Sequence, residues 1–127
     1  MEKNCWRKVE RKEAIREAKE FTLCISRKLG KLIAILFGSY ARRDFNIWND
    51  IDILVITENL PRNPLERLDL ITECLRLYPR VEPIIITIEE FIKKRDRDPA
   101  IIEASQKGIM LIDTLGLSGI LLKNSDT

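Results

Sequence analysis

Residues 33–42 read IAILFGSYAR, and residues 49–56 read NDIDILVI. The first segment is an apolar run that ends at Gly38 and Ser39, which predicts a buried strand, a tight turn and the start of a short helix. Such a turn presents a hydroxyl and backbone N–H groups, and these groups suit a phosphate. Glycine is needed at position 38 because the backbone must turn sharply and let the phosphate approach.

Two carboxylates, Asp50 and Asp52, stand two positions apart at the start of the second apolar run. Residues i and i+2 of a strand point to the same face, about 6.7 Å apart. Two like charges held that close on a buried strand are costly unless a cation lies between them. The cation that this arrangement predicts is Mg²⁺, which binds carboxylates together with nucleotide phosphates.

The Gly38-Ser39 pair, the Ala41-Arg42 that follows it and the spacing to Asp50-Ile51-Asp52 resemble the signature of the DNA polymerase β-type nucleotidyltransferase superfamily. The resemblance covers about residues 30–113 and is closest to small stand-alone prokaryotic members, the minimal nucleotidyltransferases. It implies an in-line attack on the α-phosphorus of an NTP, with ATP as the expected nucleotide. It also implies two bound Mg²⁺ ions, which Mn²⁺ can replace.

The resemblance assigns metal-binding and catalytic roles to Asp50 and Asp52, and phosphate binding to Gly38 and Ser39. In the family a third carboxylate usually comes from a neighbouring strand, and Glu82, at the start of the third predicted strand, is the candidate. Glu82 would ligate the catalytic metal or accept the proton of the acceptor. The alternative is a solvated glutamate at the start of a strand.

Two arginines follow the Gly-Ser turn. Arg42 either forks a phosphate or pairs with the aspartates to brace the turn. Arg43 stands where the family usually has glycine, and it is the weaker phosphate candidate. A long cation at that position would either bind phosphate or crowd the nucleotide.

The expected elements predict an α/β (α+β) fold, a mixed sheet of three to five strands with helices mainly on one face. The first two strands are antiparallel because their connection is too short for a crossover, whereas the second connection has room for a helix. The helix after Pro64 is expected to bury Leu65, Leu68, Ile71, Leu75 and Tyr78. The predicted helices are 8–29, 64–78, 88–95 and 99–107, and the predicted strands are 32–37, 51–56, 81–86 and 110–113.

With 127 residues, the chain is expected to form one domain over 1–127, with residues 116–127 as a tail beyond the core. It has no apolar run of membrane-spanning length and no signal-peptide core at its amino terminus, so we expect a cytoplasmic protein. Cys5, Cys24 and Cys74 are odd in number and lack metal-type spacing, which predicts reduced thiols. There is no histidine, so catalysis must depend on carboxylates, cations and metal.

Charge is unevenly distributed along the chain. Residues 1–48 carry 12 basic and 6 acidic side chains, whereas residues 49–127 carry 10 and 14. The basic half either favours a polyphosphate or nucleic acid, or forms a solvated helix face. Trp48 either stacks on a base or packs over the edge of the sheet.

The leading functional hypothesis is an enzyme that transfers a nucleoside monophosphate, AMP in the first instance, from an NTP to an acceptor hydroxyl. By the resemblance, the acceptor is a HEPN-domain protein and the chain is the antitoxin of a toxin–antitoxin pair. The alternative is a catalytically silent module that binds NTP or a partner without turnover. Nucleic-acid binding by the first helix is the weakest hypothesis, because glutamates interrupt its basic stripe. The oligomeric state stays open.

Overall fold

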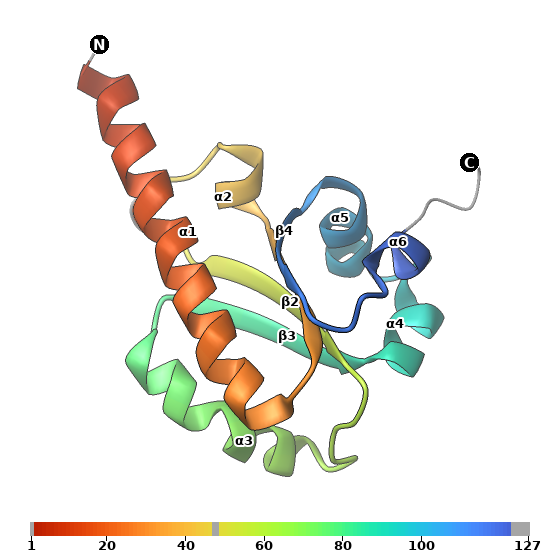
Figure 1. Ribbon diagram of the computed structural model, residues 1–127. Coiled ribbons are helices and arrows are strands. Elements are labelled where there is room, and N and C mark those ends of the chain that lie inside the picture. The colour runs from red at the N-terminus through yellow and green to blue at the C-terminus, as the bar shows by residue number, and fades with distance from the viewer. Residues whose placement is uncertain (1, 47–48, 123–127) are drawn as a thin grey trace.

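A four-stranded sheet forms the centre of the molecule (Figure 1). The computed structural model describes residues 2–46 and 49–122, with side chains from Trp6 onward; Trp48 therefore lies outside the described residues. The strand order is β3-β2-β1-β4, which confirms the predicted mixed sheet of three to five strands. The strands are β1 (Leu32–Phe37), β2 (Ile51–Thr57), β3 (Val81–Thr87) and β4 (Ile109–Asp113).

Three of the helices begin where local capping chemistry predicts. Asn63 accepts a hydrogen bond from the Leu65 amide, Thr87 and Glu90 form a reciprocal capping box, and Asp98 caps the helix that starts at Pro99. The first helix starts several residues earlier than its apolar stripe indicated, and it ends before Gly30. The helices are α1 (Glu2–Leu29), α2 (Ser39–Arg42), α3 (Pro64–Leu77), α4 (Ile88–Lys94), α5 (Pro99–Lys107) and α6 (Ser118–Leu121).

The pairing of β1, β2 and β3 brings the Gly-Ser turn and the predicted carboxylates together. β1 and β2 are antiparallel, as their short connection predicts, and Phe37 faces Asp52 across the pair. β2 and β3 are parallel because α3 provides the crossover between them, and Asp52 faces Glu82. The end of the first strand and the starts of the second and third therefore meet at one edge of the sheet.

Helices cover both faces of this sheet (Figure 1). The two long helices, α1 and α3, pack on one face over alternate residues of β1 and β2. The shorter helices α4, α5 and α6 pack on the other face, so more of the second face is covered than the sequence indicated. The predicted tail contributes to this second core, since Leu121 of α6 is buried there.

Two expectations about α1 and α3 are wrong. Cys24 and Cys74 form a disulfide, with their Cα atoms 5.9 Å apart, instead of remaining reduced. The helices lie side by side on one face of the sheet, a proximity that two cysteines 50 residues apart in sequence do not reveal. The buried stripe of α3 centres on Ile71 and Cys74, which leaves Leu65 and Leu68 exposed.

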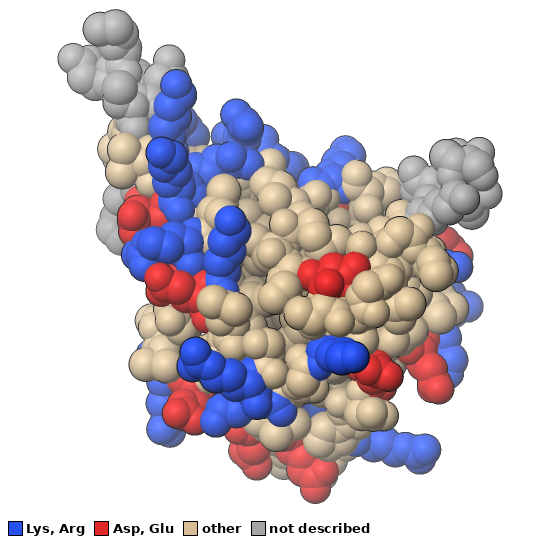
Figure 2. Space-filling view, viewed as in Figure 1, with Lys and Arg blue, Asp and Glu red and all other residues tan. Residues whose placement is uncertain are grey.

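The basic amino-terminal half is not a uniformly positive surface. Figure 2 shows Lys and Arg along α1 with acidic side chains, which in this helix are all Glu, between them. Arg16 pairs with both Glu13 and Glu20 on the exposed side of the helix. These pairs agree with the solvated-face interpretation of this part of the chain. None of the described helices is long and apolar enough to cross a membrane.

Candidate active site

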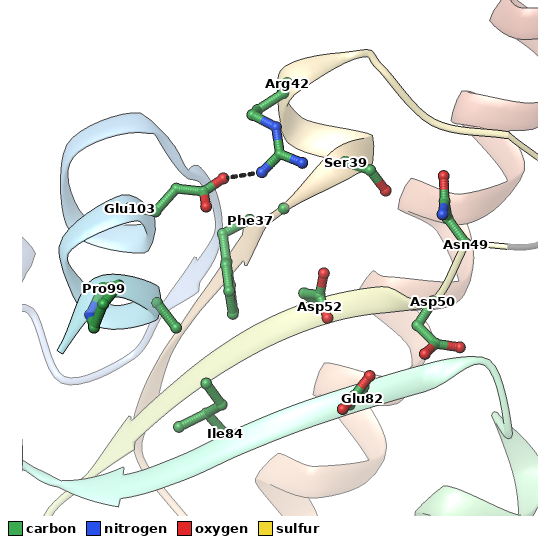
Figure 3. Close-up of a pocket in the computed structure, with 12 residues that line it drawn as sticks. Phe37, Ser39, Arg42, Asn49, Asp50, Asp52, Glu82, Ile84, Pro99 and Glu103 are labelled. Carbon is green, nitrogen blue, oxygen red and sulfur yellow. Dashed lines mark hydrogen bonds and ion pairs between the residues drawn. The ribbon is translucent and has the colours of Figure 1, made fainter.

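The described part of the chain has a cleft of about 630 Å³ at the edge of the sheet where the motifs meet (Figure 3). The sheet contributes the end of β1, the start of β2 and the start of β3, and the short helix α2 and helix α5 form the walls. The lining residues are Phe37, Gly38, Ser39, Arg42, Asn49, Asp50, Asp52, Glu82, Ile84, Pro99, Ala100 and Glu103. Six of the seven residues that the sequence predicts for the site are among them.

The Gly38-Ser39 turn lies directly against one of the predicted carboxylates. Gly38 is buried and has φ +77°, a conformation that favours glycine. A Cβ atom at this position would fall 2.2 Å from Oδ2 of Asp52. Position 38 therefore requires glycine for two independent reasons, the backbone angle and the close approach of the carboxylate.

Asp52 occupies the centre of the cleft, between Phe37 on β1 and Glu82 on β3. Its side chain is half-buried. Burial, followed by the charges of Glu82, Asp50 and Glu103, raises the pKa of Asp52 to about 6. Arg42 acts in the opposite direction and does not offset these effects. Asp52 therefore holds its proton more tightly than a free aspartate, because it is half-buried with three other carboxylates around it.

Asp50, directly before β2, and Glu82, on β3, point into the same space (Figure 3). A hydrogen bond between the two side chains is the main cause that raises the pKa of Glu82 above its ordinary value. Two carboxyl groups that approach this closely share a proton or require a cation between them. The parallel register of β2 and β3 thus places the third predicted carboxylate beside the first two.

The donor set fits a hard divalent cation. Asp50, Asp52 and Glu82 supply carboxylate oxygens, which Mg²⁺ and Mn²⁺ prefer. Across residues 2–46 and 49–122, no three acidic, cysteine or histidine side chains converge closely enough to hold an ion by themselves. Mg²⁺ usually takes one or two carboxylates and completes its shell with water and substrate phosphates, and this cleft has room for both.

The two arginines behave differently. Arg42 lines the cleft, but its guanidinium pairs with Asp44 at 3.0 Å and Glu103 at 2.5 Å, and not with the predicted aspartates. Arg43 does not line the cleft. It ends α2 with φ +73°, which gives a physical reason for the glycine that the family usually has there. Arg43 instead lies near Arg11. Burial, and to a smaller extent repulsion by the charge of Arg43, lowers the pKa of Arg11 below its ordinary value.

Sequence reasoning missed Glu103 on α5. Its side chain reaches the cleft, pairs with Arg42 and helps to raise the pKa of Asp52. No local signal marks it, because α5 is placed over the cleft by packing against the second face of the sheet. Phe37, Ile84, Pro99 and Ala100 also line the cleft and were missed. Phe37, Ile84 and Pro99 lie on the side of the cleft opposite Ser39 and Asn49 (Figure 3).

Comparison with known proteins identifies the class. Residues 15–110 match the nucleotidyltransferase domain family, and the chain belongs to that family. It is 39% identical over 57 residues to the "Putative protein adenylyltransferase MJ1305" of Methanocaldococcus jannaschii. That match covers 41% of this chain and 39% of the relative, so it spans well under half the length of either protein.

Solved structures share the fold at low sequence identity. A "putative nucleotidyltransferase" from Sulfolobus solfataricus has a TM-score of 0.63 and 19% identity, over 87% of this chain and 89% of that one. A toxin–antitoxin structure with AMP-PNP has a TM-score of 0.57 and 17% identity, over 82% and 80%. The toxin–antitoxin MntA-HepT has a TM-score of 0.51 and 15% identity, over 83% and 78%.

Proposed function

We propose that this chain is a Mg²⁺-dependent transferase that moves AMP from ATP to an acceptor hydroxyl. The observation that carries the proposal is the position of Asp50, Asp52 and Glu82. Asp52 and Glu82 come from the adjacent parallel strands β2 and β3, Asp50 directly precedes β2, and all three line one cleft with Gly38 and Ser39. Membership of the nucleotidyltransferase domain family supports the same reaction class.

Each residue has a role that its position allows. Asp50 and Asp52 would hold the metal, which when bound would neutralise the triphosphate and lower the pKa of the acceptor hydroxyl. The Ser39 hydroxyl and the backbone of the Gly38 turn would bind the β- and γ-phosphates. Arg42 would reach the same phosphates once it leaves Glu103.

Glu82 is the candidate general base. The acceptor oxygen forms a bond to the α-phosphorus, the bond to the β-phosphate oxygen breaks, and pyrophosphate leaves. The proton of the acceptor passes to the Glu82 carboxylate. Glu82 lies beside Asp50 and opposite Asp52 in the same cleft, so its carboxylate is placed to take the proton of an acceptor that approaches the metal. Its exposure at the mouth of the cleft leaves it accessible to a large acceptor.

A protein is the acceptor we favour, in particular a HEPN-domain toxin for which this chain acts as antitoxin. One relative is described as a protein adenylyltransferase. Two of the structures that share the fold are toxin–antitoxin assemblies, one of them with an ATP analogue. The open cleft, with carboxylates at its mouth, admits a hydroxyl carried on a protein surface.

The test is label transfer to the HEPN-domain protein encoded beside this chain, if its gene neighbourhood contains one, or to proteins of the host lysate. Label should pass from α-³²P-ATP and not from γ-³²P-ATP, in the presence of Mg²⁺. Glu82→Gln should bind ATP and lose transfer by about 100-fold, whereas Glu89→Gln on α4, outside the cleft, should match wild type. Transfer that changes less than about threefold in Glu82→Gln would remove Glu82 from the reaction.

A further inference from the structure

Tyr40 follows Ser39 directly but does not line the cleft. It is fully buried among the residues beneath α1, and its ring stacks on Phe45 with the centroids 4.4 Å apart. Its hydroxyl accepts a hydrogen bond from Arg80 and donates one to Glu10 at 3.3 Å. A residue of the phosphate-binding turn thus ends in a polar cluster on the side of the sheet away from the cleft.

Arg80 is the centre of that cluster. Its guanidinium also binds Glu10 at 2.9 Å and Glu17 at 3.4 Å, both on α1. Its carbonyl accepts a hydrogen bond from the amide of Ile51, the residue between the two aspartates, at 2.9 Å. Arg80 also stands two residues before Glu82. We call Tyr40, Arg80, Glu10 and Glu17 the rear cluster.

Each segment that contributes a predicted site residue therefore contacts Arg80 or lies next to it in sequence. The side chain of Arg80 binds the hydroxyl of Tyr40, which follows the Gly38-Ser39 turn. Its backbone carbonyl binds the amide of Ile51, between the two aspartates. Arg80 also directly precedes β3, which carries Glu82. A second bond reinforces the arrangement, since Nε of Arg11 on α1 donates to the carbonyl of Tyr40 at 2.9 Å.

Stability alone is a weak reason for such a cluster. Partly buried ion pairs contribute little net free energy compared with an apolar contact of the same size, because both charges lose hydration. A hydrogen-bonded cluster instead holds the groups that it joins at fixed positions relative to one another. Burial raises the pKa of Tyr40, so the phenol keeps the proton that it donates to Glu10 at neutral pH.

We propose that Tyr40 and Arg80 are positioning residues that set the distance between the phosphate-binding turn and the metal-binding carboxylates. The proposal rests on the proposed function, because only a triphosphate that contacts both the turn and the metal depends on this distance. A small displacement of reacting groups costs rate even when every group is present.

The test compares Tyr40→Phe and Arg80→Lys with wild type. Tyr40→Phe keeps the ring stack on Phe45, and Arg80→Lys keeps the charge without the planar fork that reaches Tyr40, Glu10 and Glu17 together. Tyr78→Phe is the matched control, since Tyr78 packs its ring against Phe21 outside the rear cluster. The probes are Mn²⁺ alone and the magnesium complex of α,β-methylene ATP, with thermal unfolding as a measure of folding.

We expect both variants to bind the ATP analogue about fivefold to tenfold more weakly, the loss that one or two hydrogen bonds represent. Mn²⁺ affinity should stay within about twofold, because the β2–β3 pair that carries the carboxylates remains intact. Tyr78→Phe should match wild type in both measurements, and the double variant should lose less than the product of the two single losses.

Equal losses for Mn²⁺ and for the analogue would mean general loosening of the fold and would overturn the positioning role. If wild type binds the analogue and Tyr40→Phe binds it equally well, the positioning role is also overturned. A wild-type protein that binds neither probe would instead overturn the proposed function, and the positioning role with it.

Discussion

The backbone of Gly38 touches the carboxylate of Asp52 so closely that a Cβ atom would fall 2.2 Å from Oδ2. The contact joins the two halves of the sequence motif, the turn predicted to bind phosphate and the strand with the predicted metal ligands. The short connection between antiparallel β1 and β2 produces it, because the residue after Phe37 must pass beside the residue that pairs with Phe37. The contact makes position 38 a sensitive test of the site.

Gly38→Ala should abolish function beyond its effect on stability. Alanine at φ +77° costs about 1 kcal/mol, and its methyl group must also displace Asp52. Gly30→Ala is a matched control, since Gly30 has φ +82° and no atom within 4 Å of a Cβ at that position. We expect both variants to lose free energy of unfolding in denaturant, Gly38→Ala more because of the displaced Asp52, and only Gly38→Ala to lose AMP transfer by about 100-fold or more. Equal transfer by the two variants would show that the contact with Asp52 is unimportant.

Asp52→Asn should stabilise the metal-free protein at neutral pH. The pKa of Asp52 is raised from 3.8 to about 6 in the folded protein, so the folded state binds the proton more tightly than the unfolded state. Ionisation therefore reduces wild-type stability as the pH rises from about 4 to about 6, and the reduction is complete above that range.

Thermal melts in EDTA across this range should show Asp52→Asn equal to wild type below about pH 4 and more stable above about pH 6. Asp69→Asn, an exposed change on α3, serves as control. A variant that is less stable than wild type at neutral pH would mean that Asp52 has a structural role. Added Mg²⁺ with ATP should raise the melting temperature of wild type only.

Glu103→Gln should strengthen nucleotide binding. The substitution removes a negative charge from the cleft and releases Arg42 from a 2.5 Å ion pair, so that the guanidinium can reach a phosphate. We expect the affinity for Mg²⁺·ATP to rise about threefold in calorimetric titration. Asp44→Asn removes the other partner of Arg42 outside the cleft and should have a smaller effect. Weaker binding by Glu103→Gln would show that Glu103 holds Arg42 in its working position.

Reduction of the Cys24–Cys74 bond should destabilise the fold. The bond closes a loop of about 50 residues between α1 and α3 and so restricts the unfolded chain. We expect the bond to contribute roughly 2 to 4 kcal/mol to the free energy of unfolding. Denaturant unfolding with and without dithiothreitol measures the difference. Cys74→Ser should unfold at the lower stability in both conditions. Wild type that unfolds identically with and without the reductant would mean that the bond contributes nothing.

Local chemistry explains why much of the fold was predictable. β1 has the predicted bounds, and the caps at Asn63, Thr87 and Asp98 are set by residues within one turn of each helix. Glu82 was named through the family resemblance, and the parallel register of β2 and β3 places it opposite Asp52.

Side-chain contacts between elements far apart in the sequence were not predictable. The Arg42–Glu103 pair joins residues 61 positions apart, and it depends on where α5 packs. The disulfide and the rear cluster depend likewise on how α1 crosses the sheet. The stripe of α3 was misjudged at Leu65 and Leu68 because apolar residues at helical spacing do not show where the supporting sheet ends.

The most direct test of the metal-nucleotide site is equilibrium binding of ATP by wild type and Asp52→Asn, each with Mg²⁺ and with excess EDTA. The carboxylates of Asp50, Asp52 and Glu82 repel a triphosphate unless a cation lies between them. Wild type with Mg²⁺ should therefore bind at least about tenfold more tightly than wild type in EDTA or Asp52→Asn in either condition. Equal binding by wild type with and without metal would contradict the account.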